Sequence, residues 1–182
     1  MKNTVIPDVP KGVLVLTAGI DVNERTTNYE IVGWGPQYES WGIEYGAINE
    51  DPRQPRLWEE LNRLLYQRRF TCGDGEQMEI RKIAIDSGYL AEPVYKFTAK
   101  RTYRVIATKG RSYGLDRPFL YANARITRGM VRTLLLELNV DRGKRDVVYW
   151  FDKISAPGPG YCHLPLKDGH RSMVTAISTM KN

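Results

Sequence analysis

The chain has 182 residues, of which 42% are hydrophobic and 26% are charged. These values are typical of soluble globular proteins and exclude disordered and collagen-like classes, and this length supports one hydrophobic core. Neither a membrane-spanning apolar run nor a signal peptide is present, so we expect one intracellular domain without a membrane. The net charge of +6 favours an anionic partner. Cys72 and Cys162 are too few for a zinc site or a disulfide framework.

The first third of the sequence predicts a three-stranded antiparallel meander. An apolar run over Gly12–Ile20 indicates a buried strand, and it ends on Asp21. The stretch Tyr29–Trp34 alternates in polarity, Gly35 and Pro36 interrupt it, and Ser40–Ile48 resumes the alternation. Short polar turns between such strands join neighbours in a sheet.

Helices and strands alternate in the middle of the chain. Apolar residues at helical spacing predict a helix over Pro55–Arg69, and Met78–Ile85 is an apolar strand that stops on Asp86. A second helix is predicted over Ala91–Arg101, followed by a buried strand over Tyr103–Thr108. This order predicts an α/β domain with a mixed sheet, in which right-handed crossovers bring the later strands parallel to the first.

The remaining residues predict smaller elements. Glycines and basic residues predict a mobile, positively charged loop over Lys109–Pro118. We expect a third helix over Ile126–Leu138 and a short strand over Val147–Ile154. A Pro/Gly turn at Ala156–Gly160 then precedes a short extended piece at Tyr161–Leu164.

Two aspartates carry the most specific chemical signal, because Asp21 and Asp86 each end a hydrophobic strand. Ligand sites gather at the carboxyl ends of neighbouring strands in open α/β sheets. Two carboxylates close together repel, and a shared divalent cation such as Mg²⁺ or Mn²⁺ relieves the repulsion. A pair of such ions can activate water against a phosphodiester. Spacing alone leaves a second interpretation open, in which both residues only cap strands or begin turns.

Short stretches along roughly residues 9 to 166 match one protein family in the same order. They are Val9-Pro10-Lys11-Gly12, Leu16-Thr17-Ala18-Gly19-Ile20-Asp21-Val22, Val32-Gly33-Trp34-Gly35, Glu39-Ser40-Trp41, Asp51-Pro52, Leu57-Trp58, Ile85-Asp86-Ser87-Gly88, Lys109-Gly110-Arg111-Ser112 and Gly158-Pro159-Gly160-Tyr161-Cys162-His163-Leu164-Pro165. In this order the sequence resembles the nuclease domain of the GpA-type (lambda-like) large terminase subunit of tailed bacteriophages.

The resemblance implies an RNase-H-like fold, with the meander and the parallel strands in one mixed sheet flanked by helices. It implies a metal-dependent endonuclease that cuts concatemeric double-stranded DNA during genome packaging, in the cytoplasm of the bacterial host. The partners implied for the full-length protein are the terminase small subunit and the portal.

The resemblance also assigns roles to single residues. It implies that Asp21 and Asp86 are catalytic metal ligands for Mg²⁺ or Mn²⁺, with two ions in a complete site. The charge of their loop, and not the resemblance, leads us to expect that Lys109 and Arg111 contact the DNA backbone beside the metals, and a solvated basic loop is the alternative that stays open. Arg132 stands where the family has a lysine-bearing segment, so charge is retained there, although Arg and Lys are not interchangeable.

The end of the sequence departs from the family. Family members continue into a final helix that supplies a third carboxylate, whereas a helix predicted over Lys167–Asn182 offers only Asp168. No Gly-x-x-x-x-Gly-Lys-Ser/Thr phosphate loop of an ATPase occurs either. We therefore expect residues 1–182 to be a single nuclease domain, truncated at the C-terminus and lacking the N-terminal ATPase domain, with little activity alone.

Two other functional classes stay open. A catalytically incomplete terminase remnant would bind DNA or packaging partners without cutting, and the missing acidic helix favours it. A Holliday-junction resolvase or a transposase core would share the two strand-end aspartates, but not the Thr-Ala-Gly-Ile-Asp and Lys-Gly-Arg-Ser context.

Overall fold

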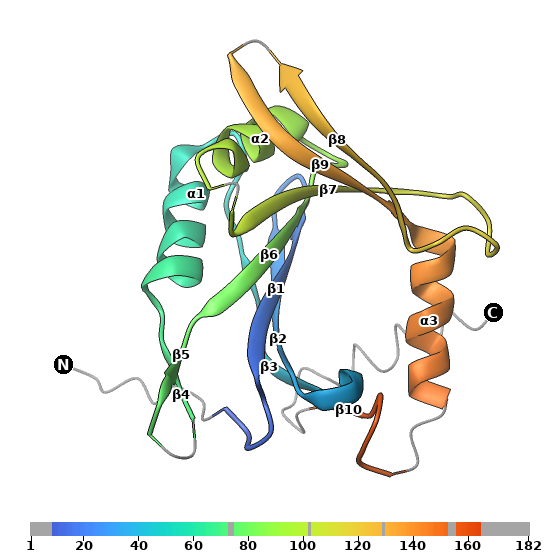
Figure 1. The fold of residues 1–182 in the computed structure, drawn as a ribbon. Coiled ribbons are helices and arrows are strands. Elements are labelled where there is room, and N and C mark those ends of the chain that lie inside the picture. The colour runs from blue at the N-terminus through green and yellow to red at the C-terminus, as the bar shows by residue number, and fades with distance from the viewer. Residues whose placement is uncertain (1–8, 73–74, 102, 129, 153–155, 165–182) are drawn as a thin grey trace.

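The computed structural model describes residues 9–72, 75–101, 103–128, 130–152 and 156–164 (Figure 1). In these residues an eight-stranded sheet has the order β10-β3-β2-β1-β6-β7-β9-β8, and a two-stranded sheet pairs β4 with β5. The strands are β1 (Val15–Val22), β2 (Thr27–Trp34), β3 (Ser40–Ile48), β4 (Phe70–Thr71), β5 (Gln77–Met78), β6 (Ile80–Asp86), β7 (Val105–Arg111), β8 (Leu120–Arg128), β9 (Val131–Asn139) and β10 (Cys162–His163). None of the helices in these ranges is long and apolar enough to cross a membrane.

The predicted meander is confirmed. Strand β1 pairs antiparallel with β2 over its whole length, and β2 pairs antiparallel with β3. The strand that ends near Asp21 is the fourth of eight in the main sheet, so it is central as predicted. Alternate residues of this strand, Leu16, Ala18, Ile20 and Val22, are buried, so it buries one face and not both.

The parallel half of the sheet is also confirmed. Strand β6 lies parallel to β1, β7 lies parallel to β6, and β9 lies parallel to β7. The first crossover includes α1 (Pro55–Asn62), which continues into the π-helical turn η2 (Arg63–Gln67), and the second includes α2 (Ala91–Ala99). The two predicted crossover helices therefore exist, within a few residues of their expected bounds.

The core lies between the sheet and these two helices. Leu57 and Leu61 of α1 and Val94 of α2 are fully buried in the cluster that contains Leu16 and Ile83 of the sheet. Burial of each such side chain contributes about 1.5 to 3 kcal/mol. Because side chains alternate along a strand, the residues between these core positions point to the opposite face of the sheet.

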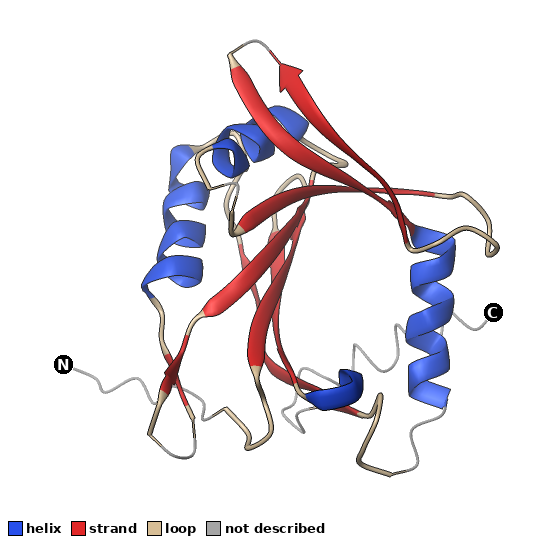
Figure 2. Cartoon of the chain, viewed as in Figure 1, coloured by secondary structure: helices blue, strands red, loops and turns tan. Residues whose placement is uncertain are grey.

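The prediction of a helix over Ile126–Leu138 is wrong. This segment forms the antiparallel hairpin of β8 and β9, in which Arg128 pairs with Val131 (Figure 2). The leucine run satisfies helical spacing, yet β9 pairs along the edge of β7 and buries Thr133 and Leu135 beside α2. Pairing with an open strand edge satisfies backbone groups that would otherwise stay unpaired, so tertiary context overrides the local pattern.

The prediction of a strand over Val147–Ile154 is also wrong. Helix α3 spans Val140–Asp152, and residues 153–155 lie outside the described residues. An i,i+4 ion pair between Arg142 and Asp146, at 2.9 Å, supports this helix. The β-branched pair Val147 and Val148 favours a strand locally, but it is too short to override the helical context.

The loop predicted from Lys109 starts later, since β7 continues through Arg111. Backbone N–H of Gly114 donates to Asp141 of α3 at 2.8 Å, and the Asn139 side chain donates to the Gly114 carbonyl at 2.7 Å, so the loop is tied to the start of α3. The turn over 156–160 and the extended piece at Cys162–His163 are confirmed, and the latter pairs parallel with β3.

Candidate active site

Asp21 and Asp86 lie on adjacent parallel strands. Ile20 of β1 is in register with Ile85 of β6, so the two aspartates follow side by side at the carboxyl ends of these strands. Neighbouring strands lie about 4.7 to 4.9 Å apart. Both residues alternate with buried core residues, which places their carboxylates on the face away from α1 and α2. The predicted adjacency is therefore confirmed.

A hydrogen bond restrains each carboxylate. The Asn23 side chain donates to Oδ2 of Asp21 at 2.9 Å, and the backbone N–H of Gly88 donates to Oδ2 of Asp86 at 3.1 Å. Ser87 fixes the turn between Asp86 and Gly88, because both its N–H and its hydroxyl donate to the Thr108 carbonyl of β7 at 2.8 Å. The Asp-Ser-Gly sequence thus anchors this turn to the next strand and holds the carboxylate.

The absence of a side chain at Gly88 leaves room for the Asp86 carboxylate. A Cβ atom there would lie 2.8 Å from Oδ2 of Asp86, closer than real Cβ contacts come. Any larger residue would displace the carboxylate or the turn. The small size of Gly88, two residues after Asp86, is therefore explained by this contact, which the sequence pattern alone did not show.

The electrostatics of the pair favour a cation. Burial raises the pKa of Asp86, and the negative charge of Asp21 raises it further, while the N–H groups of Gly88 and Ser87 and the charge of Lys109 lower it. The net effect is a raised pKa, so burial and the charge of Asp21 disfavour the ionised form of Asp86. A divalent cation between the two carboxylates would remove both penalties.

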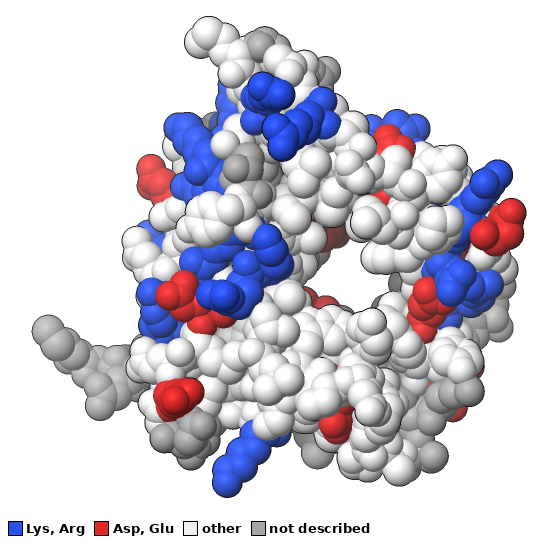
Figure 3. Space-filling model, viewed as in Figure 1, with Lys and Arg blue, Asp and Glu red and all other residues white. Residues whose placement is uncertain are grey.

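Glu30 is an acid that sequence reasoning did not single out. It pairs with Gly19 in the β1–β2 register and so lies on the same face as Asp21. Burial raises the pKa of its carboxyl, and a Cβ atom added at Gly19 would meet nothing within 4 Å. The sequence held one signal for it, because two strands of a predicted hairpin can place Glu30 and Asp21 on the same face of the sheet. In Figure 3 an opening passes between the sheet and α3, with acidic atoms at its margin.

The predicted basic residues lie at different distances from the pair. Lys109 follows Thr108, whose register partner is Asp86, and its charge acts on the pKa of Asp86. Arg111 lies two residues further along β7 and forms an ion pair with Glu137 at 3.3 Å. The charge of Lys109 therefore reaches Asp86, whereas the charge of Arg111 is partly neutralised by Glu137.

Arg132 lies apart from the acids. It pairs with Thr127 near the start of β9, four residues before Leu136, which is in register with Thr108. At about 3.3 Å per residue this is roughly 13 Å along the strand. The side chain of Arg132 is exposed.

The donors of the pair suit a hard cation. Carboxylate oxygens are the preferred ligands of Mg²⁺ and Mn²⁺. Within the described ranges, no group of three or more His, Cys, Asp or Glu residues could hold a metal ion. Asp168 and the helix predicted over Lys167–Asn182 lie outside the described residues. The residues present therefore fit a cation through two carboxylates.

Comparison with known proteins agrees with this arrangement. The family model described as terminase large subunit gpA, endonuclease domain, matches residues 2–176. This chain belongs to that family. The terminase large subunit of Escherichia phage lambda is 31% identical over 167 residues, which cover 86% of this chain and 25% of that protein. The chain thus spans about a quarter of that relative's length. No solved structure matches the chain.

The family assignment confirms the resemblance found in the sequence. The mixed sheet flanked by helices is also consistent with the RNase-H-like fold that the resemblance implied.

Proposed function

We propose that this gpA-family domain is a metal-dependent endonuclease that cuts concatemeric double-stranded DNA during phage genome packaging. The observation that carries the proposal is the position of Asp21 and Asp86, which directly follow the register pair Ile20 and Ile85 at the carboxyl ends of β1 and β6. Membership of the endonuclease-domain family supports it. The arrangement matches the chemistry of a hydrolase that works on a polyanion, because paired carboxylates gather cations.

In this proposal Asp21 and Asp86 hold Mg²⁺ or Mn²⁺, with two ions in a complete site. When bound, such cations polarise the scissile phosphodiester and stabilise the charge that develops on its oxygens. The Asn23 amide and the Gly88 N–H orient the two carboxylates by the hydrogen bonds described above. The Lys109 ammonium, at the neighbouring strand, neutralises phosphate oxygens beside the acids.

Arg111 and Arg132 serve as backbone contacts in the same proposal. Arg111 lies at the end of β7, and Arg132 lies on the hairpin strand β9, so they would contact phosphates at increasing distance from the cleavage point. Phosphate contacts position a duplex without reading its sequence. We infer low sequence specificity for this domain alone.

The wider setting follows from the same proposal. In the full-length protein, the terminase small subunit and the portal would be the packaging partners, and the reaction would take place in the cytoplasm of the bacterial host. The similarity to the lambda terminase large subunit supports this setting.

One observation favours a second candidate function. The described residues bring only two carboxylates together, and no three-ligand cluster occurs among them. Because Mg²⁺ demands near-octahedral oxygen coordination, two aspartates hold an ion loosely. A domain that binds DNA or a packaging partner without cutting it is therefore the alternative.

Nicking of supercoiled plasmid in Mg²⁺ or Mn²⁺ tests the proposal. We expect nicking by the wild-type domain that Asp21→Asn and Asp86→Asn each abolish. Glu76→Gln is the matched control, since it removes one exposed carboxylate between β4 and β5, ahead of β6 and away from the carboxyl end that carries Asp86, and should leave nicking unchanged. Nicking that survives Asp21→Asn would reject the assignment, and metal-free DNA binding without nicking in either metal would favour the second candidate.

A further inference from the structure

A basic groove lies between α1 and α2, on the side of the molecule away from the acid pair. It has a volume of about 870 Å³. The cationic residues that line it are Arg53, Arg63, Lys96, Lys100 and Arg101, and Glu59 is the acidic residue among its lining. Figure 3 shows Lys and Arg side chains gathered over this side of the molecule. The groove therefore concentrates positive charge.

Of the five cations, Arg53 pairs with Asp51 at 3.2 Å and Lys96 pairs with Glu92, and the other three make no ion pair within the described residues. In the described part of the chain, Arg63 and Lys100 make no ion pair and no side-chain hydrogen bond. Arg101 donates to the neutral partners Asn62, at 2.7 Å, and the Phe97 carbonyl, at 3.1 Å, so its charge remains. Lys96 pairs with Glu92 at 2.7 Å, but both side chains are more than half exposed and water screens the pair.

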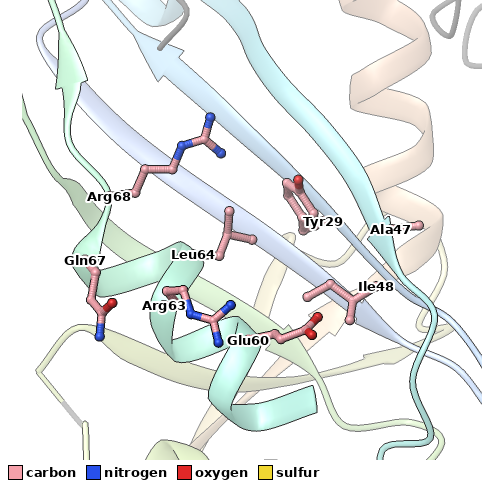
Figure 4. A pocket seen from close by; sticks show the side chains of 8 residues that line it. All are labelled: Tyr29, Ala47, Ile48, Glu60, Arg63, Leu64, Gln67 and Arg68. Carbon is pink, nitrogen blue, oxygen red and sulfur yellow. The ribbon is translucent and has the colours of Figure 1, made fainter. Parts of the chain in front are cut away.

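A second hollow lies beside the groove and contains a paired arginine. It lies between α1 and strands β2 and β3, with a volume of about 500 Å³ (Figure 4). Its Arg68 forms an ion pair with Glu44, which also accepts a hydrogen bond from the Tyr29 hydroxyl at 2.9 Å. Burial raises the pKa of Tyr29 to about 12, with the Glu44 hydrogen bond adding to the shift. In that hollow Arg68 is therefore paired, whereas Arg63, which lines both the hollow and the groove, makes no ion pair within the described residues.

The position of the groove relates it to the cleavage site. Helices α1 and α2 cover the core face of the sheet, so the groove opens outward from the face opposite Asp21 and Asp86. At one end Arg53 donates to the Tyr89 hydroxyl at 3.1 Å, and Tyr89 lies three residues after Asp86. The groove therefore starts beside the sheet edge that carries the acids and runs away from it.

We propose that this groove is a second binding site for the phosphodiester backbone of duplex DNA, holding a stretch outside the cleavage site. The inference rests on the proposed DNA-cutting function. Lys96 and Lys100 are one helical turn apart, about 5 to 6 Å between their Cβ atoms, and a repeat of cations suits a polyanion better than a single carboxylate. The arginines add planar, two-pronged donors for phosphate oxygens.

The test is metal-free binding of a labelled duplex of about 30 base pairs, measured by fluorescence anisotropy at several salt concentrations. Arg63→Ala/Lys100→Ala removes the two unpaired cations of the groove. Lys11→Ala/Arg81→Ala is the matched control, because it removes the same charge from exposed positions before β1 and at the start of β6. Circular dichroism checks that each variant is folded.

We expect the groove variant to lower the slope of log K against log salt by about 1 to 2, and to weaken binding roughly 10- to 60-fold at about 0.1 M salt. The control should change neither value appreciably. Acetylation of Lys96 and Lys100, read by mass spectrometry, should be suppressed by the duplex while acetylation of Lys11 is not.

The outcomes separate this inference from the proposed function. If the wild-type domain binds no DNA, both fall. If it binds, and Lys109→Ala lowers the salt slope while the groove variant does not, the groove is not a DNA site and the proposed function stands. Unprotected Lys96 and Lys100 would overturn the inference in the same way, and would direct attention to an acidic protein partner.

Discussion

Replacing Gly88 by Ala should weaken cation binding without unfolding the domain. The added methyl group would lie 2.8 Å from Oδ2 of Asp86, closer than the 3.0 Å that real Cβ contacts respect, and an ordinary contact at 3.4 Å needs the carboxylate to move by 0.6 Å (3.4 minus 2.8). That movement also stretches the 3.1 Å hydrogen bond from the Gly88 N–H. Loss of a group that orients a metal-binding carboxylate typically costs about 10- to 100-fold in metal affinity.

The stability of this variant should change little. Gly88 is exposed and is not among the glycines with positive φ, and Ala at a compatible position stabilises by about 0.4 to 1 kcal/mol. Titration with Mn²⁺, followed by the electron paramagnetic resonance of the free ion, measures affinity, and thermal unfolding measures stability. Asp86→Asn sets the value for a lost ligand. A folded Gly88→Ala variant with wild-type Mn²⁺ affinity would refute the reasoning about this carboxylate.

Further substitutions test other parts of the structure. Burial raises the pKa of Glu30 above its ordinary value of 4.5, so its ionised form destabilises the folded state once the pH exceeds 4.5. Glu30→Gln should therefore raise Tm at neutral pH by roughly 1 to 4 °C. This gain in Tm must disappear in acid, where Glu30 is protonated in both states. Thr98→Val leaves the buried Thr133 hydroxyl without its 2.7 Å partner and should cost about 1 to 3 kcal/mol in urea unfolding. Adding Thr133→Val should then cost less than its single effect, and strict additivity would contradict the contact. Lys109→Ala should lower the salt slope of duplex binding by about 0.9, and an unchanged slope would place Lys109 outside the DNA path.

Patterns that depend on burial were predictable from the sequence. The runs that end on Asp21 and Asp86 form central strands, and central strands need little context beyond their own apolar residues. The aspartate pair follows from them, because crossovers through helices have a fixed hand and bring strand ends to one edge.

The errors share a different cause. The segment that forms β8 and β9 satisfies both a helical and an extended pattern, and the choice is made by the open edge of β7, which no local window contains. Glu30 was missed for a related reason, since its face is defined only once the β1–β2 register is known. Both depend on strand register, which is set by pairing between two segments and not by the residues of one of them.

The short strand β10 has a consequence for how the domain folds. Its pairing of Cys162 with Ser40 closes a loop of more than a hundred residues, and the backbone N–H of Ser40 donates to the Tyr161 carbonyl at 2.8 Å. A 2.8 Å contact between His163 and Glu39 and the stacking of His163 on Trp41 add to this closure. Contacts so remote in sequence form late, because their loop entropy must be overcome after local structure exists. Strand β10 is therefore expected to dock last and to detach first, so the Ser40 amide should exchange its hydrogen faster than the amides of β1.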